Sequence, residues 1–206
     1  RALSNEETTA IHSGLEQYAE QLKEKRRNSI AHGKPHLAPL DGLKYPHWFI
    51  PFCHLAMHTG LRPGDLASLT WSELNLNFSR LTKYPEKTRH HADPAQVDLT
   101  LNEHILFVMT EWHRQQGRPA TGLVFPSDRA KRLDKKAHLR HWAAVRSLAG
   151  LCDQIDFYAL RHNFCSRLVM QGVPLLAVAK LAGHKSADMI ERHYGHLCPN
   201  VAAQAL

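Results

Sequence analysis

The sequence predicts a mainly helical α+β protein with one small antiparallel sheet. Apolar residues recur at helical spacing through most of the chain, whereas a two-residue alternation appears in short segments at residues 74–76 and 96–99. The chain has 206 residues, 43% of them hydrophobic, which is enough to bury one well-formed core. Because no internal linker divides it, we expect a single domain over residues 1–206.

A long amphipathic helix is predicted at the start of the chain. Ser4 followed three residues later by Glu7 is the capping-box pattern that begins a helix. Apolar residues then recur every three or four positions through Leu22. We place the end of this helix in the cationic run at residues 23–27. Residues 28–46 hold three prolines and two glycines, so we expect a surface loop there.

The middle of the chain combines helices with the two short strands. An apolar segment over residues 48–57 predicts a helix that stops at Gly60, a typical C-cap residue. Pro63 then begins a short helix through Leu69, and a charged, Pro-interrupted connection separates the strands. Two further amphipathic helices follow, one containing Ile105, Val108, Met109 and Trp112 and the other containing Leu139, Trp142, Val145 and Leu148.

The last third of the chain predicts three helices in quick succession, over residues 158–171, 174–182 and 187–194. Gly172 and Gly183 punctuate them, because glycine readily adopts the left-handed conformation that ends a helix.

The charge balance points to a polyanionic partner. Lys and Arg number 26 against 19 for Asp and Glu, which gives a net charge of +7. No apolar run approaches the roughly 18 to 20 residues of a membrane span. The four cysteines form neither a CxxC pair nor a disulfide framework, so we expect a reduced, cytoplasmic protein.

The chain also holds sixteen histidines. None stands in the HExxH or Cys/His spacing that is typical of zinc sites. The sequence therefore predicts no metal and no small-molecule cofactor.

Four segments carry residue types that suit phosphodiester chemistry. Breaking a phosphodiester bond requires a nucleophile, positive charge on the non-bridging oxygens and a proton for the leaving oxygen. The segments are HTGLRPGDL at residues 58–66, EKTR at 86–89, YALRH at 158–162 and LAGH at 181–184, with Tyr194 ten residues after the last of these.

In this order the segments resemble the motifs of the tyrosine recombinase, or phage integrase, family, over about residues 48–197. The resemblance implies a helical catalytic domain that cuts and rejoins double-stranded DNA at specific sites, to integrate or excise a mobile element. It implies a covalent 3′-phosphotyrosyl intermediate formed without metal or ATP. It also implies a DNA-bound tetramer of protomers, no membrane partner, and a core-binding domain upstream of Arg1.

The resemblance assigns a role to each matching residue. Tyr194 would attack phosphorus as the nucleophile. Arg62 and Arg161 would bind the scissile phosphate, since a planar guanidinium suits two phosphate oxygens at once. His184 would donate a hydrogen bond to the same phosphate, and Lys87 would protonate the leaving 5′ oxygen.

Three features depart from the family pattern. The usual LGH segment is written LAGH at residues 181–184, which keeps Gly183 and His184. The other two features are Tyr158 and the length of the connection after Lys87. Tyr158 stands where the family has His or Lys; a phenol can donate a hydrogen bond, but with an unperturbed pKa near 10 it is a poor base. The connection that follows Lys87 is longer than is typical, so Lys83 stays an alternative general acid.

Two other functions fit part of the pattern. The helices over residues 157–193 resemble a helix-turn-helix in outline, which would suit a DNA-binding module without catalysis. That interpretation leaves Arg62, Lys87 and Tyr194 unexplained. A type IB topoisomerase-like enzyme would use similar groups. Covalent trapping on DNA separates an enzyme from a module, and strand exchange between two sites separates a recombinase from a topoisomerase.

Overall fold

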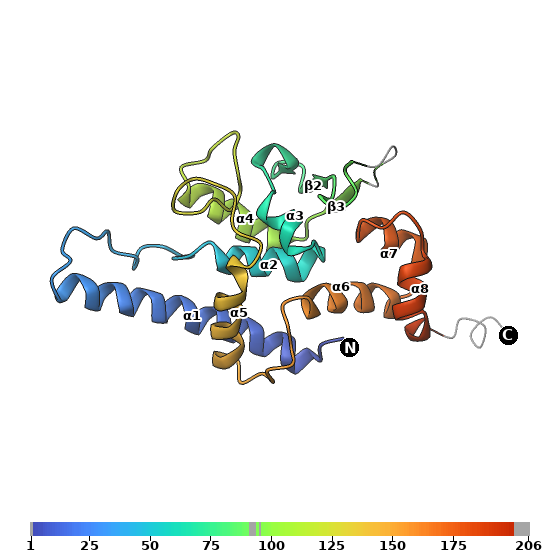
Figure 1. Ribbon diagram of the computed structural model, residues 1–206, viewed down its shortest axis with the longest axis horizontal. Coiled ribbons are helices and arrows are strands. Elements are labelled where there is room, and N and C mark those ends of the chain that lie inside the picture. The colour runs from blue at the N-terminus through green and yellow to red at the C-terminus, as the bar shows by residue number, and fades with distance from the viewer. Residues whose placement is uncertain (1, 91–93, 95, 200–206) are drawn as a thin grey trace.

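The computed structural model describes residues 2–90, 94 and 96–199. It is mainly helical with one three-stranded antiparallel sheet, which confirms the predicted fold class (Figure 1). In chain order the elements are α1 (Asn5–Ala31), α2 (Phe49–Thr59), α3 (Pro63–Ala67), η1 (Trp71–Glu73), β1 (Leu74–Asn75), β2 (Arg80–Lys83), β3 (Val97–Thr100), α4 (Glu103–Gln115), α5 (Ala137–Leu148), α6 (Ala159–Met170), α7 (Leu175–Leu181), α8 (Asp188–Tyr194) and η2 (Gly195–Leu197).

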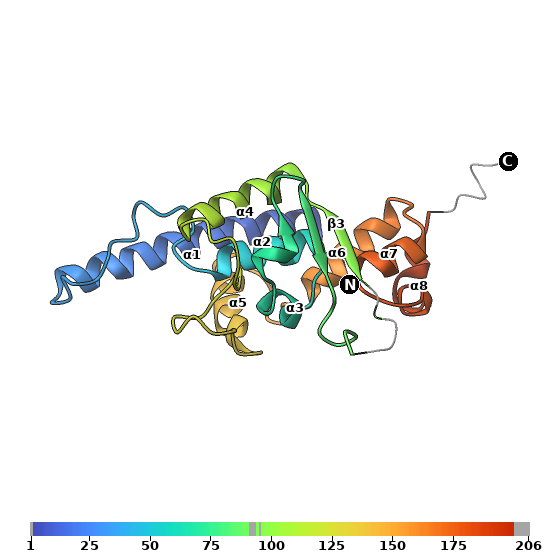
Figure 2. The ribbon, with the colours of Figure 1, turned by 90° about the horizontal axis from the view of Figure 1, so that it is seen from above.

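Helix α2 lies at the centre of the main core. It packs against α4 and α6, while α1 packs against α5 (Figures 1 and 2). Nine of its eleven residues are buried, as expected for a helix that is apolar on all sides. The two others are His54 and His58, one helical turn apart. The C-terminal end of α2 is therefore held in place from several directions.

Helix α1 begins as predicted but ends later than predicted. Ser4 and Glu7 form the full capping box, with both reciprocal hydrogen bonds present. The helix continues through Ala31, so the predicted loop over residues 28–46 begins four residues too early. The chain that returns after the helix contacts the turn just before this extension, because Arg26 donates to the Ala38 carbonyl at 2.7 Å and Arg27 pairs with Asp41. Both contacts join residues that are 12 or more positions apart, which helical periodicity does not consider.

The sheet contains a strand that the sequence analysis placed in the connection. The predicted strands at residues 74–76 and 96–99 are confirmed as β1 and β3, and β2 lies between them in the order β1-β2-β3. Leu81 of β2 pairs with Leu74 and Leu99. The second inward residue of β2 is Lys83, only 3% exposed. Because this inward position holds a lysine, the sequence of β2 lacks the alternation of apolar and polar residues by which a strand is recognised.

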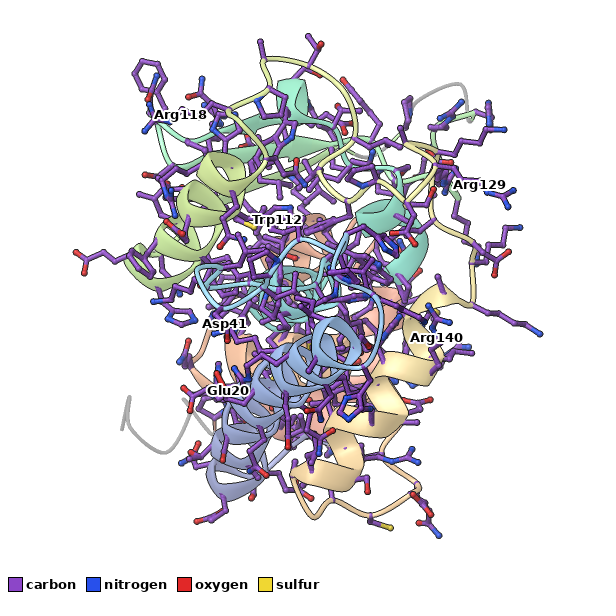
Figure 3. The ribbon with its side chains drawn as sticks, turned by 90° about the vertical axis from the view of Figure 1, so that its left-hand side faces the viewer. Glu20, Asp41, Trp112, Arg118, Arg129 and Arg140 are labelled. Atoms are coloured by element: carbon purple, nitrogen blue, oxygen red, sulfur yellow. The ribbon has the colours of Figure 1, made fainter. Side chains whose placement is uncertain are left out.

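The remaining helices follow the predictions with small shifts. Helix α3 ends at Ala67, two residues before the predicted end. Helices α6, α7 and α8 match their predicted ranges to within a residue or so at each end. Trp112 of α4 is partly buried, and its indole N–H donates to the Val124 carbonyl at 2.8 Å. Arg118 and Arg129 lie at the periphery of the molecule in Figure 3.

A second, smaller apolar cluster joins α6, α7 and α8 at the right-hand end of the molecule in Figures 1 and 2. Its buried residues are Cys165, Val169, Val178, Ala179, Ala182, Ile190 and Tyr194. All four cysteines of the chain are free thiols. Across the part of the chain that the structure describes, no helix combines the length and apolar character needed to cross a membrane.

Gly60 fixes the corner between α2 and α3. It is the left-handed C-cap of α2, with φ of +62°, as the sequence predicts. A Cβ at this position would lie 2.4 Å from Cδ1 of Phe164 on α6. Glycine is thus required both for the turn and for the close approach of α6.

We expect Gly60→Ala to lower the free energy of unfolding by roughly 2 to 5 kcal/mol. This sum combines about 1 to 2 kcal/mol for a left-handed alanine with about 1 to 3 kcal/mol for overpacking. Gly172 is the matched control, because its φ is +79° but nothing lies within 4 Å of its Cβ position. Urea unfolding curves measure both variants. If Gly172→Ala is equally destabilised, the contact with Phe164 is unimportant.

Candidate active site

Arg161 stands at the centre of the predicted site. It is 5% exposed, and its Nη1 donates to the Gly60 carbonyl and its Nη2 to the Ala182 carbonyl, both at 2.6 Å. Nη2 also lies 2.9 Å from Nε2 of His184. These bonds use three of the five N–H groups of the guanidinium. The two other N–H groups make no such bond to the described residues.

His184 is held in one tautomer by this contact. An arginine only donates, so Nε2 of His184 accepts and the proton lies on Nδ1. Burial, followed by the positive charges of Arg161, Arg62 and Lys87, lowers the pKa of His184 to about 4. The imidazole is therefore neutral at pH 7 and offers one N–H donor.

Gly183 sets the position of His184. Gly183 has φ of +71° and ends α7, and the His184 N–H donates to the Ala179 carbonyl at 2.8 Å. A Cβ on Gly183 would lie 2.8 Å from Cγ of Pro85 and 2.9 Å from Cγ2 of Val97. The end of α7 therefore rests directly on the hairpin formed by β2 and β3, as Figure 2 shows.

Arg62 contributes a second guanidinium with an unsatisfied donor. It is the N-cap of α3, and its side chain is 19% exposed. Its Nη1 is buried without a hydrogen-bond partner among the described residues, and Asp65 Oδ2 lies 3.8 Å away. Burial and the neighbouring Arg161 lower the pKa of Arg62, although arginine still carries its charge at neutral pH. A buried donor of this kind is suited to an anion that enters from solvent.

Asp65 anchors the connection that carries Lys87. Its Oδ1 accepts from the Glu86 N–H at 2.7 Å, and the Glu86 carboxylate in turn binds Arg132 at 2.9 Å. Lys87 is exposed, and its positive charge acts on His184. The structure thus brings Lys87 to the same side of the molecule as Arg62 and His184.

Lys83, the alternative general acid, is already paired. Its ammonium donates to both carboxylate oxygens of Glu73 at 3.0 Å and to the Ser68 carbonyl at 3.1 Å. The group is nearly inaccessible, with 4% of the side chain exposed. In this arrangement it joins β2 to η1.

Tyr194 lies in the small apolar cluster and is 8% exposed. Its hydroxyl is 2.5 Å from Nδ1 of His162. Burial raises the pKa of the Tyr194 phenol well above its usual value, the nearby Cys165 and Tyr158 act in the same direction, and Arg161 opposes them. The hydroxyl therefore needs a proton acceptor before it can act as a nucleophile.

Tyr158 lies at the edge of the site and is 39% exposed. Its ring meets the His162 ring edge-on, with the ring centroids 5.1 Å apart. Its phenol also lies close enough to Arg62 to favour the charged form of that guanidinium. Tyr158 thus contacts both the phosphate-binding side and the Tyr194 side of the site.

Sequence reasoning missed two residues of this arrangement. His162 follows Arg161 within the YALRH segment, and Asp65 lies within the HTGLRPGDL segment, but neither received a role. The signal was their position inside motifs already singled out. Their partners, Tyr194 and the Glu86 backbone, are remote in sequence, so spacing alone could not identify the contacts.

Taken together, the site offers two guanidinium groups, one neutral imidazole donor and one exposed ammonium around a single region, beside a buried phenol. This combination suits a phosphate, because each donor matches a phosphate oxygen and the charges offset its own. The His12, His54 and His104 rings, a possible metal-binding group, belong to α1, α2 and α4 and lie outside this site.

Comparisons with known proteins show which family and fold this chain resembles. The profile of the Phage integrase family matches residues 45–200. The integrase of Salmonella phage P22 is 28% identical over 156 residues, which cover 70% of this chain and 38% of that protein. The chain therefore spans less than half the length of this curated relative.

Solved structures share the fold. The XerH site-specific recombinase bound to its palindromic difH substrate aligns with a TM-score of 0.64 at 19% identity, covering 99% of this chain and 52% of that one. A lambda integrase tetramer bound to a Holliday junction aligns with a TM-score of 0.60 at 20% identity, covering 93% of this chain and 47% of that one.

The state of His184 is open to direct measurement. We expect its imidazole to carry the proton on Nδ1 at pH 7 and to titrate with a pKa near 4. In the unfolded chain the same group titrates near pH 6.5. Between these values the unfolded chain binds more protons, so this contribution to stability is lost as the pH falls from about 6.5 to about 4.

Nitrogen-15 NMR of the histidine side chains reports both the tautomer and the titration. The loss of one signal in His184→Gln assigns the resonance. A midpoint near 6.5, or a proton on Nε2, would contradict the contact with Arg161.

Proposed function

Because the chain belongs to the phage integrase family, we propose that it is the catalytic domain of a site-specific tyrosine recombinase. It cuts and rejoins double-stranded DNA, for integration or excision of a mobile element. One observation carries the proposal: Arg161 binds Gly60, Ala182 and His184 at once, so that three motifs remote in sequence converge on one guanidinium.

The proposed reaction begins at Tyr194. Its oxygen attacks phosphorus, a bond from phosphorus to the phenol oxygen forms, and the bond to the 5′ oxygen breaks. His162 Nδ1 takes the phenol proton, which is supported by their separation of 2.5 Å and by the lowered pKa that keeps the imidazole neutral. The covalent link conserves the phosphodiester bond energy, so that the reverse attack by a 5′ hydroxyl rejoins the strand without ATP.

The phosphate is held by the two guanidinium groups and by His184. Among the described residues, two N–H groups of Arg161 make no hydrogen bond, and the buried Nη1 of Arg62 lacks a partner. The Nδ1–H of His184 adds a neutral donor. Donors fixed before the substrate arrives stabilise the charge that develops in the transition state without further reorganisation. Tyr158, which adjoins Arg62 and meets the His162 ring edge-on, donates a hydrogen bond to the phosphate or to the nucleophile.

Lys87 supplies the proton for the leaving 5′ oxygen. It is exposed and lies on the connection that Asp65 fixes beside Arg62. Lys83 carries the same charge but already donates to Glu73 and Ser68. A lysine that is free to reach the substrate is the better general acid.

The partners follow from the same assignment. Double-stranded DNA is the substrate, and the net charge of +7 supports binding to its phosphates. The lambda integrase structure contains a tetramer bound to DNA, and we propose the same kind of assembly for this chain. We also propose a core-binding domain upstream of Arg1. No cofactor is needed for the steps described. The DNA substrate and the free thiols support action in the cytoplasm.

We expect Tyr194→Phe to form no covalent protein–DNA adduct on a nicked suicide substrate, because the attacking oxygen is gone. DNA binding should be retained, since the phosphate ligands are unchanged. Denaturing gel electrophoresis detects the adduct, and a mobility-shift assay measures binding. His162→Gln, which removes the proton acceptor, should slow adduct formation roughly ten- to a hundredfold, from a lost hydrogen bond of about 1.5 to 3 kcal/mol.

Tyr45→Phe is the matched control. Tyr45 is also buried, but it lies in the loop that precedes α2 and lines a groove together with residues of α1 and α4. This variant should form adducts at the parent rate. Adducts formed by Tyr194→Phe would remove Tyr194 from its role and the central proposal with it.

A substrate with sulfur at the 5′ bridging position distinguishes Lys87 from Lys83 as the general acid, because sulfur departs without protonation. Lys87→Ala should cut normal DNA at least about a hundredfold more slowly, in line with the usual contribution of a general acid. The sulfur substrate should restore most of the rate. Single-turnover cleavage measures both substrates.

Lys83→Ala is the comparison. It should lower the unfolding midpoint, because it leaves the Glu73 carboxylate without its cation, yet show no selective rescue by sulfur. Rescue of Lys83→Ala together with a silent Lys87→Ala would transfer the role to Lys83.

A further inference from the structure

Four histidines gather on the face of α2 that looks toward α1 and α4. His54 and His58 stand one turn apart on α2 and interrupt its otherwise buried sequence. His12 comes from α1, and His104 from the first turn of α4. None of the four takes part in the site described above. Four imidazoles at the meeting point of three helices require a separate explanation.

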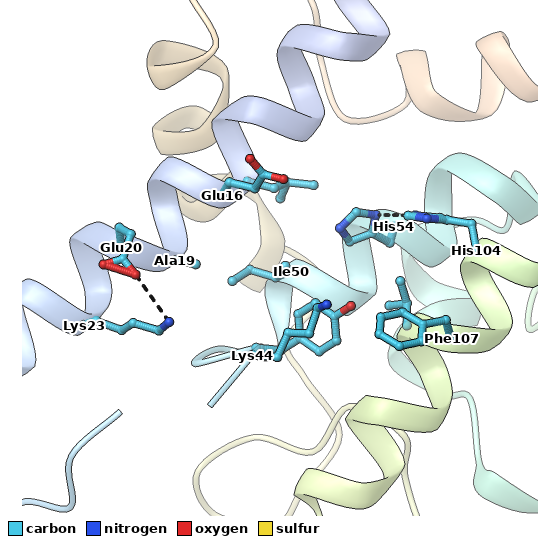
Figure 4. Close-up of a pocket in the computed structure, with 12 residues that line it drawn as sticks. Glu16, Ala19, Glu20, Lys23, Lys44, Ile50, His54, His104 and Phe107 are labelled. Carbon is cyan, nitrogen blue, oxygen red and sulfur yellow. Dashed lines mark hydrogen bonds and ion pairs between the residues drawn. The ribbon is translucent and has the colours of Figure 1, made fainter. Parts of the chain in front are cut away.

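Three of the rings have the spacing of metal ligands. One nitrogen from each of His12, His54 and His104 lies within 4.8 Å of the others. Nε2 of His104 is 3.3 Å from Nδ1 of His54, the contact drawn in Figure 4. Two nitrogens bound tetrahedrally at a zinc–nitrogen distance of about 2.05 Å would be about 3.3 Å apart. That pair already has the separation that a tetrahedral ion requires.

Histidine binds a metal through the lone pair of a ring nitrogen, and each of the three rings brings one such nitrogen to the cluster. Among the charged groups that face the cluster, Glu16 of α1 favours a cation, whereas Lys44 and Arg167 oppose it.

His58 supplies a donor directed by Asn102. The Asn102 Oδ1 accepts the N-cap bond from Ile105, so its amide nitrogen is the group that faces His58 Nδ1, at 3.4 Å. The His58 proton therefore lies on Nε2, which is buried without a partner among the described residues. The His58 ring is 5.0 Å from that of His104. Water bound to an ion at the cluster would give this donor an acceptor.

An ion could reach the cluster from solvent on two sides. A groove of about 460 Å³ is lined by His54 and His104, together with Lys44 and Phe107 (Figure 4). A second groove of about 280 Å³ is lined by His12 and His58. His104 itself is exposed.

We propose that His12, His54 and His104 bind one divalent cation of the zinc type, with a water molecule in the fourth position that accepts from His58. All-imidazole sites suit borderline metals such as zinc, copper and nickel rather than magnesium or calcium. The sequence analysis predicted no metal because its rules use short spacings. These three ligands are separated by 42 and 50 residues, since they stand at positions 12, 54 and 104.

Such an ion would join α1, α2 and α4 at one point. Because a preformed site is absent from the unfolded chain, the binding free energy adds to folding stability. Helix α2 leads directly to Gly60, whose carbonyl binds Arg161. The ion is therefore a structural clamp on the helix that carries one side of the phosphate-binding site.

The experiment uses the 206-residue chain after dialysis against a chelator. Zinc chloride is titrated in by calorimetry, and cobalt chloride is the spectroscopic probe, because tetrahedral cobalt absorbs visible light strongly. We expect one ion per chain, cobalt bands of tetrahedral type and a higher thermal midpoint with zinc. His104→Gln removes one ligand, and the fold should tolerate the change because residue 104 is exposed. Its affinity for zinc should fall by more than about a hundredfold, because the loss of a residue that only supports a ligand already lowers metal affinity about ten- to a hundredfold.

His36→Gln is the matched control, because His36 is an exposed histidine outside the cluster. It should bind zinc and gain thermal stability like the parent chain. Binding that is equally strong in His104→Gln, or no stoichiometric binding by the parent chain, would overturn the proposal. These outcomes do not depend on DNA cleavage, so they leave the proposed recombinase function untouched.

Discussion

The buried guanidinium of Arg161 is the interaction on which the arrangement of the site depends. A buried charge must be compensated, because losing its water shell costs several kcal/mol. The two backbone acceptors that compensate it are the carbonyls of Gly60 and Ala182, the C-cap residues of α2 and α7. Carbonyls at helix C-termini lack intrahelical donors and carry partial negative charge. The Arg161 guanidinium thus joins the C-terminal ends of α2 and α7 to the start of α6.

This convergence requires that the chain segments approach very closely. Gly60 touches Phe164 of α6, and Gly183 touches Pro85 and Val97 of the hairpin, at distances that leave no room for a Cβ. The glycines therefore do more than end helices: they bring the hairpin and its lysine, the α2–α3 corner and His184 to one place. Arg62 Nη1, beside this corner, is buried without a partner among the described residues, which prepares the site for an anion.

Helix α2 is a mainly buried, apolar helix that contacts two polar regions, the site around Arg161 and the histidine cluster. At its C-terminal end it presents the Gly60 carbonyl to Arg161, and on one flank it carries His54 and His58. Its other residues are buried, so it cannot shift easily without disturbing the packing on all sides. A ligand that fixes either region would stabilise the helix that both share.

Much of the fold and of the site could be predicted from the sequence, because the signals are local. Helical periodicity placed most helices, and Ser4 and Gly60 marked boundaries through capping rules that depend on a few adjacent residues. The ordered motifs selected Arg62, Arg161, His184 and Tyr194, since each motif is a short segment with its own chemistry. Strand β2 was missed because Lys83, at an inward position, is compensated by Glu73, a partner that pattern rules do not consider.

The sequence by itself therefore determined the elements, the family motifs and the chemical types at the site. Only the tertiary structure decided which groups are paired and which are free. It pairs Lys83 with Glu73 and leaves Lys87 exposed, sets the hydroxyl of Tyr194 against His162, and gathers His12, His54 and His104. The physical reason is the same in each case: hydrogen bonding and burial depend on distances between residues remote along the chain, which no local pattern encodes.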